Sequence, residues 1–219
     1  MIGAVKGYDV EIVMSSAVSI ERQKMIKAFG AKITLTNASL GTDGAIKKVK
    51  DLMLEFPDKY FTTNQFSNKY NKLAHYHTTG KEIWEQTNGK IDYLVCAIGT
   101  SGTIMGIGSY LKEKNPNIKL VEAHPIKGHY IQGLKNMKEA IVPALYDESK
   151  INISIKIESE EAFEIARQLP KKEGIFAGMS SGAAMLAALR VAEKIDSGNI
   201  VVVFPDRGEK YLSTQLFKV

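Results

Sequence analysis

The segment at residues 99–103 is the part of the sequence best suited to binding chemistry. All of its residues are small: Gly99, Thr100, Ser101, Gly102 and Thr103. An apolar run at 91–98, typical of a buried strand, precedes it, and a helical pattern at 103–114 follows it. The first N–H groups of a helix have no partner within the helix, and they lie at its positive end. The segment therefore predicts a site for an anion, typically a phosphate group.

A purely structural role explains the same glycines equally well. A tight turn from a strand into a helix can require glycine for backbone reasons alone. The segment does not match the dinucleotide-binding pattern GxGxxG, because Ser101 stands where the second glycine would be. No Gly-Lys-Ser/Thr follows, so it is not a nucleotide P-loop. Considered alone, the segment leaves the binding site and the plain turn open.

Two further turns of small residues occur later in the chain. Residues 178–182 open an alanine-rich helical pattern, and residues 205–208 follow the last apolar strand pattern. In parallel sheets, ligands bind at the carboxyl ends of the strands. We therefore predict that the three turns line one crevice.

Short apolar runs alternate with longer helical patterns along the chain. The predicted strands lie at 8–14, 31–36, 60–64, 91–98, 118–123, 151–157 and 199–204. The predicted helices lie at 20–29, 41–56, 81–87, 103–114, 159–169 and 182–195, with Ser19 and Ser159 as helix caps. This alternation indicates an α/β fold with parallel sheets flanked by helices. Residues 124–149 are predicted to be irregular.

The composition excludes several classes of protein. Hydrophobic residues make up 44% and charged residues 24% of the 219 residues, which excludes a disordered chain and a coiled coil. No apolar run approaches the ~20 residues that span a bilayer, so no membrane association is expected. Only four of the 29 basic residues are arginine, which argues against a nucleic-acid partner. The N-terminus has no signal-peptide pattern and Cys96 is the one cysteine, so we expect a cytoplasmic location.

The histidines do not indicate a metal site. His75 and His77 are two residues apart with no cluster of cysteine or carboxylate around them, which favours a pair on a helix surface. His124 and His129 flank the irregular stretch, where a histidine can face the substrate, but most loop histidines face solvent, and this is the expectation here. Cys96 lies in the middle of a predicted strand and is interpreted as a small buried hydrophobic residue.

Taken together, these motifs resemble the cysteine synthase family, which are pyridoxal-phosphate (PLP) enzymes of fold type II, with the tryptophan synthase β-like architecture. The resemblance spans essentially the whole chain. Its motifs are SIERQKMIKAFG at 19–30, TTGKEIW at 78–84, GTSGT at 99–103, SSGAA at 180–184 and YLST at 211–214. Residues 74–76, 132–136 and 206–208 are similar to the B isozyme.

The resemblance implies roles for individual residues. Residues 99–103 would hold the phosphate of PLP. Ser180 would lie beside the pyridine nitrogen, where a neutral hydroxyl leaves the ring unprotonated. Gly133 lies in the strip that closes over the substrate, and Asn64 stands where relatives place a contact to the substrate carboxylate.

Asp206 is also a cofactor-binding residue by this resemblance, since it stands where some relatives place a serine near the same ring. An ionised carboxylate at the pyridine nitrogen would hold a proton there. We therefore expect the side chain of Asp206 to turn toward Arg207 or Lys210.

Two motifs of the family have no match in the sequence. One carries the lysine that forms the Schiff base with PLP, and the other is the asparagine-containing loop that grips the substrate carboxylate. Residues 1–8 resemble the back half of the helix that follows this loop. The N-terminal segment of the family pattern is thus expected to be missing, and no catalytic residue is assigned.

The resemblance implies a β-replacement that makes L-cysteine from O-acetylserine, or a related activated serine, and sulfide. The alternative is a non-catalytic remnant or binding module that keeps only the phosphate-binding half. We expect residues 1–67 to be the remnant of a smaller N-terminal lobe and residues 68–219 to be the larger lobe. The expected partners are the small-molecule substrate and either a second copy of the chain or an N-terminal segment supplied by a partner.

Overall fold

The computed structural model describes residues 1–217, which form two compact units. Unit 1 contains Met1–Thr62 and the C-terminal residues from Glu209 onward, and unit 2 contains Thr63–Gly208. The C-terminal segment therefore packs with the N-terminal residues in unit 1, although it follows unit 2 in the sequence. The lobe boundary expected near residue 67 remains a prediction about the folding domains.

A four-stranded parallel sheet forms the centre of unit 2. Its strands are β3 (Tyr93–Ala97), β4 (Lys119–Pro125), β5 (Ile153–Ile157) and β6 (Ile200–Val202), in the spatial order β5–β4–β3–β6. The predicted α/β fold with parallel strands is confirmed. Val95 and Val121 are fully buried, as expected when helices cover both faces of a parallel sheet.

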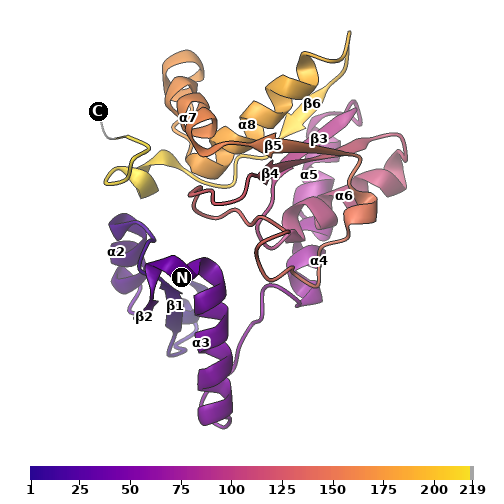
Figure 1. Cartoon of the computed structure of the whole chain (residues 1–219). Coiled ribbons are helices and arrows are strands. Elements are labelled where there is room, and N and C mark those ends of the chain that lie inside the picture. The colour runs from indigo at the N-terminus through magenta and orange to yellow at the C-terminus, as the bar shows by residue number, and fades with distance from the viewer. Residues whose placement is uncertain (218–219) are drawn as a thin grey trace. The chain divides into compact units, whose positions relative to one another are not determined.

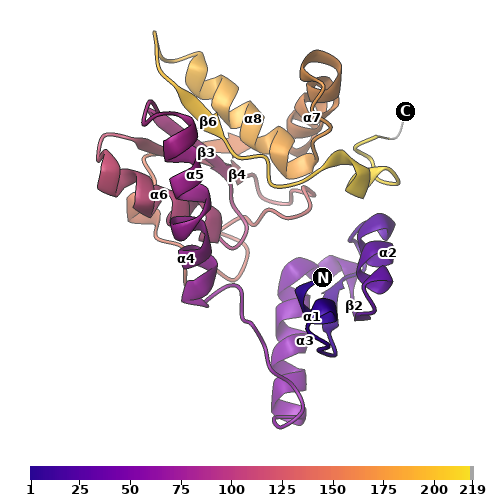
Figure 2. The same cartoon turned by 180° about the vertical axis from the view of Figure 1, so that it is seen from behind.

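Helices pack on both faces of this sheet (Figures 1 and 2). On one side lie α4 (Lys69–His77), α5 (Thr79–Gln86) and α6 (Gly102–Lys114), and on the other lie α7 (Ser159–Glu173) and α8 (Met179–Ala192). The apolar core between α6 and the sheet contains Leu94, Cys96 and Ile107. Burial raises the pKa of the Cys96 thiol, so the interpretation of this residue as a buried hydrophobic group is confirmed.

The prediction was wrong between residues 60 and 77. Residues 60–64 form no strand, because they pair with no other strand. The polar stretch that follows contains α4, which the sequence did not predict. This helix begins at an asparagine cap, since Asn68 Oδ1 accepts a hydrogen bond from the N–H of Tyr70 at 3.0 Å.

Ser19 stands at the N-cap of α2 as predicted, but its side chain makes no capping hydrogen bond, and the predicted cap at Ser159 and the predicted end of that helix were wrong. Ser159 Oγ accepts from the N–H of Tyr130 at 3.1 Å, and Ser19 Oγ donates to the carbonyl of Lys210 at 2.6 Å. Helix α7 continues through Pro170, which lies in its last turn. Gly174 ends the helix in the left-handed conformation, with φ of 69°. The irregular stretch is confirmed up to the short 3-10 helix η2 (Glu148–Lys150).

Unit 1 is built around two parallel strands, β1 (Glu11–Ser15) and β2 (Lys32–Thr36). Its other elements are α1 (Ile2–Val5), α2 (Ile20–Ala28), η1 (Ala38–Leu40), α3 (Gly41–Glu55) and the C-terminal η3 (Gly208–Tyr211). The C-terminal segment packs on α2 within this unit. Glu21 accepts hydrogen bonds from the N–H and the hydroxyl of Ser213, and the buried Tyr211 contacts Arg22.

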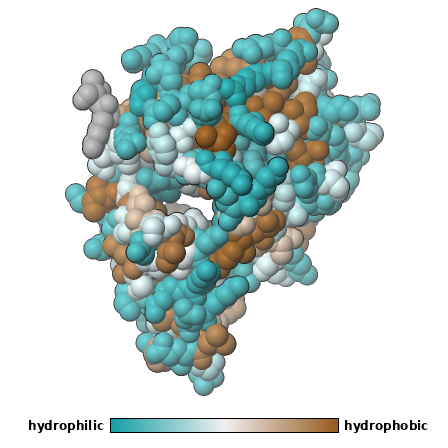
Figure 3. Space-filling model, viewed as in Figure 1, coloured by the Kyte–Doolittle hydropathy of each residue, from teal (hydrophilic) through white to brown (hydrophobic). Residues whose placement is uncertain are grey.

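Many large apolar side chains of unit 1 are exposed. Among them are Val5 at 84%, Leu54 at 82% and Phe61 at 89% relative exposure. The space-filling view shows brown apolar patches among the teal polar side chains of this unit, in its lower part (Figure 3). The two strands also leave the other edge of each strand unpaired in the described sheet.

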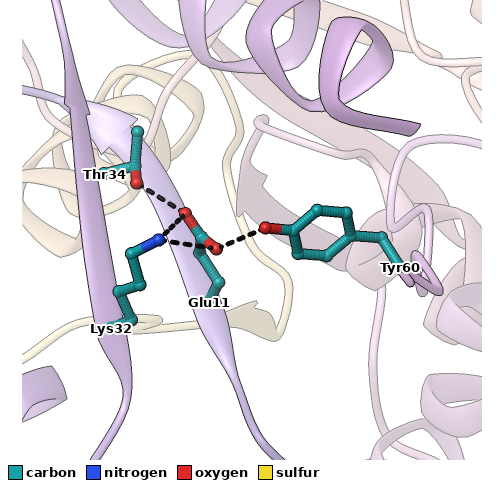
Figure 4. A network of polar contacts seen from close by, with 4 residues as sticks. All are labelled: Glu11, Lys32, Thr34 and Tyr60. Carbon is teal, nitrogen blue, oxygen red and sulfur yellow. Dashed lines mark hydrogen bonds and ion pairs between the residues drawn. The ribbon is translucent and has the colours of Figure 1, made fainter. Parts of the chain in front are cut away.

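A polar network ties β1 to β2 and to the segment after α3 (Figure 4). Glu11 accepts hydrogen bonds from Thr34 Oγ1 at 2.6 Å and from the Tyr60 hydroxyl at 3.0 Å. Lys32 Nζ lies 3.3 Å from the same carboxylate. The hydrogen bond from Thr34, with smaller contributions from Tyr60 and Lys32, lowers the pKa of Glu11 below its ordinary value.

This network predicts an acid-sensitive stability. Because the pKa of Glu11 is lower in the folded chain, its stabilising effect is complete above the unfolded value of 4.5 and is lost as the pH falls through the lowered value. We expect Glu11→Gln to reduce the free energy of unfolding by about 1 kcal/mol at pH 7. In urea titrations the difference from the parent should be smaller at pH 3 than at pH 7. An equal difference at both pH values would contradict this account of the network.

Candidate functional site: an anion loop and the turns around it

Residues 99–103, here called the anion loop, connect the end of β3 to the start of α6. Ser101 adopts the left-handed conformation, with φ of 65°, and the helix begins at the next residue. Among residues 1–217, no acceptor lies within hydrogen-bonding distance of the backbone N–H groups of Thr103 and Ile104. The predicted turn from strand to helix is confirmed, and its free donors lie at the positive end of a 13-residue helix.

The hydroxyl of Ser101 is the most informative atom of the loop. The residue is only 4% exposed, and its Oγ is buried without a hydrogen-bond partner among the described residues. A buried polar group without a partner costs about 1–3 kcal/mol. A plain structural turn gains nothing from this cost, whereas a bound anion would accept the hydrogen bond. This observation favours the binding site over the plain turn.

Helix α4 supports the anion loop from the side. Asn71 Nδ2 donates to the carbonyl of Gln65 at 2.7 Å and to Thr100 Oγ1 at 3.0 Å. A Cβ atom on Gly102 would lie 2.1 Å from Asn71 Oδ1, so only glycine leaves room for this side chain. The sequence analysis missed Asn71. The closely spaced asparagines of an unrecognised helix were the only signal that could have indicated it.

His75 links the anion loop to the Thr-Thr-Gly turn before α5. Its Nε2 lies 3.1 Å from Thr103 Oγ1, and its Nδ1 lies 3.0 Å from Thr79 Oγ1. Burial lowers the pKa of His75, which favours the neutral imidazole. When Nε2 carries the proton, it donates to Thr103 Oγ1 and leaves the Thr103 hydroxyl hydrogen free for an anion. The prediction of a histidine pair on a helix surface was therefore wrong for His75.

Gly133 lies between the anion loop and the start of α8. It adopts a φ of 102°, and its carbonyl oxygen would lie 2.5 Å from a Cβ atom on Gly99. A Cβ atom on Gly133 itself would lie 3.1 Å from Ser180 Oγ. The anion loop, the Gly133 turn and the start of α8 are thus adjacent, and the prediction that the three small-residue turns line one crevice stays a prediction.

Asp206 occupies the N-terminus of α8. One carboxylate oxygen accepts from the N–H of Ser180 at 3.0 Å, and the other accepts from the N–H of Ser181 at 2.8 Å and from its hydroxyl at 2.6 Å. The expectation that this side chain turns toward Arg207 or Lys210 missed these partners. The two free N–H groups of the first helical turn attract the carboxylate more directly than a flexible cation does.

The remaining site residues have less defined surroundings. Ser180 Oγ donates to the carbonyl of Gln132 at 3.0 Å, next to Gly133. Asn64 is exposed, with φ of 45°, and its carbonyl accepts from the N–H groups of Ser67 and Asn68. It lies one residue before Gln65, which Asn71 connects to the anion loop. No group of three metal-ligating side chains occurs within residues 1–217.

The loop histidines do not face solvent as expected. His124 Nε2 accepts a hydrogen bond from the N–H of Met137 at 3.2 Å. His129 Nδ1 is buried without a hydrogen-bond partner in the described part of the chain. Burial lowers the pKa of His129, although Glu139 acts in the opposite direction. Both histidines therefore belong to the packing of the segment after β4.

A parallel sheet with an open helix N-terminus at the end of a strand is typical of ligand-binding α/β proteins, and comparison with known proteins defines the class further. Residues 1–206 match the model of the family described as "Pyridoxal-phosphate dependent enzyme". The chain belongs to this family and, within it, to the cysteine synthases, as the relatives below establish.

The most similar curated relatives are named cysteine synthases. The chain is 48% identical to the cysteine synthase of Aquifex aeolicus, over 99% of this chain and 68% of that protein. It is 38% identical to cysteine synthase B of Pseudomonas aeruginosa, over 99% of this chain and 72% of the relative. The crystal structure of cysteine synthase from Entamoeba histolytica superposes with a TM-score of 0.88 and 43% identity, covering 99% of this chain and 67% of that one.

The anion loop fits the phosphate group of the cofactor that names this family. The fit rests on the unpartnered Ser101 hydroxyl, on the free N–H groups of Thr103 and Ile104, and on the small residues that let an anion approach the backbone. Asp206 fits a direct contact to the cofactor less well, because both of its oxygens already accept hydrogen bonds from α8.

The contacts of Asp206 generate a prediction about stability. Asp206→Ala should leave the N–H groups of Ser180 and Ser181 buried without an acceptor, at a cost of about 2–4 kcal/mol in the free energy of unfolding. Asp206→Asn keeps one acceptor oxygen and should lose about half as much. Urea denaturation of both variants measures the order. Equal stability of Asp206→Ala and the parent chain would show that the carboxylate does not hold the start of α8.

Proposed function

We propose that this chain carries the cofactor-binding part of a PLP-dependent β-replacement that makes L-cysteine from O-acetylserine, or a related activated serine, and sulfide. The observation that carries the proposal is the buried, unpartnered Ser101 hydroxyl at the open N-terminus of α6. Membership of the cysteine synthase family supports the reaction type.

The proposed roles follow from the contacts in unit 2. Residues 99–103 hold the phosphate with their N–H groups and hydroxyls, and His75 orients the hydroxyl of Thr103. Ser180 would lie beside the pyridine nitrogen. Its hydroxyl, which donates to the carbonyl of Gln132 in this structure, would then donate to that nitrogen instead. Asp206 acts through the backbone of Ser180, as a positioning residue. We propose this indirect role for Asp206 in place of the direct contact to the cofactor that the family resemblance implies.

When bound, PLP supplies an electron sink for the bond changes at the substrate's α- and β-carbons. The chain's own contribution is to hold the phosphate, to keep the ring nitrogen beside a neutral hydroxyl and to limit the space around the substrate. Gly133 has no side chain and an exposed position, so it leaves room for the substrate at the edge of the anion loop. Asn64 is the proposed contact to the substrate carboxylate.

The Schiff-base lysine is the part of the proposed chemistry that no motif of this sequence supplies. A lysine in that role forms the covalent link to the cofactor and moves the α-proton. We propose that it comes from a further segment, in the same polypeptide or in a partner. The alternative, a binding module without catalysis, uses the same anion loop and differs only in lacking this segment.

We further propose that the protein acts on small molecules in the cytoplasm and assembles with a second copy of itself. No helix within residues 1–217 is long and apolar enough to cross a membrane. The exposed apolar side chains of unit 1 support association, because covering them removes apolar surface from water. The further segment that carries the lysine would also cover part of this apolar surface of unit 1.

Ligand binding at the anion loop is testable by thermal unfolding. Inorganic phosphate and PLP should each raise the melting temperature, and at a hundredfold excess over the dissociation constant the gain is about 2.7 kcal/mol. Ser101→Ala should stabilise the ligand-free chain, because it removes a buried hydroxyl without a partner, and should reduce the gain from phosphate. Ser109→Ala, on the same helix, is the control and should keep the full gain.

An unchanged response of Ser101→Ala to phosphate, together with an unchanged ligand-free stability, would mean that the hydroxyl does not face a binding site. The loop would then be a structural turn.

The reaction itself is testable with an in-frame fusion. The part of the Aquifex aeolicus cysteine synthase that this chain does not match, placed before Met1, should give a protein that forms cysteine from O-acetylserine and sulfide. Holding the lysine against the cofactor is a matter of proximity, which contributes about 7–11 kcal/mol to catalysis. The same fusion with the Schiff-base lysine changed to alanine should be inactive. A folded, PLP-bound fusion without activity would favour the binding module.

A further inference from the structure

The segment at residues 131–137 lies directly against the anion loop. The N–H of Lys135 donates to the carbonyl of Ile98 at 2.9 Å, immediately before the loop. The carbonyl of Gly133 approaches Gly99, as described above. Any displacement of this segment therefore changes the wall of the proposed site.

Two hydrogen bonds from the end of β4 hold the same segment from its other side. Asn136 Nδ2 donates to the carbonyl of Pro125 at 2.8 Å, and the N–H of Met137 donates to His124 Nε2 at 3.2 Å. The carbonyls of Ile98 and Pro125 do not titrate near neutral pH. His124 is the one titratable acceptor among these three contacts.

We propose that His124 is a positioning residue, which holds the 131–137 segment against the anion loop only while its imidazole is neutral. Because Nε2 accepts the hydrogen bond, the proton of the neutral ring is at Nδ1. A second proton would be added at Nε2 and would place an N–H donor against the N–H of Met137. The contact is therefore present at higher pH and is lost as His124 is protonated. The link to substrate binding rests on the proposed function, but the contact itself does not.

Charged groups near His124 come from its own stretch of chain and from the neighbouring strand β5, where Lys156 is the register partner of His124. His129 interacts electrostatically with His124, and burial keeps it neutral to lower pH than an ordinary histidine by lowering its pKa. Glu139 favours the protonated form of His129, and its carboxylate accepts from the N–H of Gly128 at 3.0 Å. Lys135 Nζ donates to the carbonyl of Ile141 at 3.2 Å. Protonation of His124 thus adds positive charge beside Lys156, its register partner on β5.

Amide hydrogen exchange tests the proposal on the whole chain without any ligand. The protection factor of the Met137 amide is the intrinsic exchange rate divided by the observed rate at each pH, so the general pH dependence of exchange cancels. Between pH 8 and pH 5 we expect it to fall roughly three- to tenfold in the parent chain, as for the loss of one hydrogen bond. His124→Gln keeps an acceptor oxygen that does not titrate, so its protection should be independent of pH. His124→Leu should have low protection at every pH.

The controls separate this contact from a general loss of structure. His77→Gln changes an exposed histidine of α4 and should keep the pH dependence of the parent chain. Amides in α8 should stay protected in all variants, which shows that unit 2 remains folded. Parent-like protection of Met137 in His124→Leu, or parent-like pH dependence in His124→Gln, would overturn the proposal. Failure of phosphate to bind would overturn the proposed function and leave these exchange results unaffected.

Discussion

The open N-terminus of α6 is the constraint on which the rest of the site depends. A helix presents free N–H groups and a partial positive charge at this end. Here those groups follow a buried strand, next to a serine hydroxyl that is buried without a partner. Nothing in residues 1–217 accepts hydrogen bonds from the N–H groups of Thr103 and Ile104, so an anion from outside the chain is the natural partner.

The first N–H groups of α8, unlike those of Thr103 and Ile104 in α6, have a partner within the described chain. They are occupied by Asp206, a residue that arrives from 25 positions further along the chain. In unit 2 the N-terminus of α8 is therefore neutralised by a carboxylate of the chain, whereas that of α6 is left open. The internal carboxylate fixes Ser180 beside Gly133, and His75 and Asn71 fix the open loop from α4. This contrast supports the proposal that the turn at 99–103 is a binding site, whereas the start of α8 is capped by the chain itself. The composition of the two glycine-containing turns alone does not separate these roles.

The sequence was sufficient where the signal was local. Apolar runs and small-residue turns located β3, β4 and the anion loop, because buried parallel strands and strand-to-helix turns have strong compositional patterns. The sequence did not predict hydrogen bonds between a side chain and a partner far away along the chain. Ser19 and Ser159 resemble helix caps locally, yet each bonds to a backbone group brought near by tertiary packing. His75 and Asn71 were missed for the same reason, since they lie in a polar stretch whose helical pattern was not recognised and whose partners are about 30 residues away.

The central claim is that residues 99–104 form one anion site, and an NMR titration of the 15N-labelled chain with inorganic phosphate tests it most directly. The amide signals of Ser101, Thr103 and Ile104 should shift first and together, with one saturating binding curve, because their N–H groups point at the anion. The signals of Ser180 and Ser181 should move little, since Asp206 already occupies them. Weak, non-saturating shifts spread over the lysine-rich surface, with the loop amides unmoved, would contradict the account.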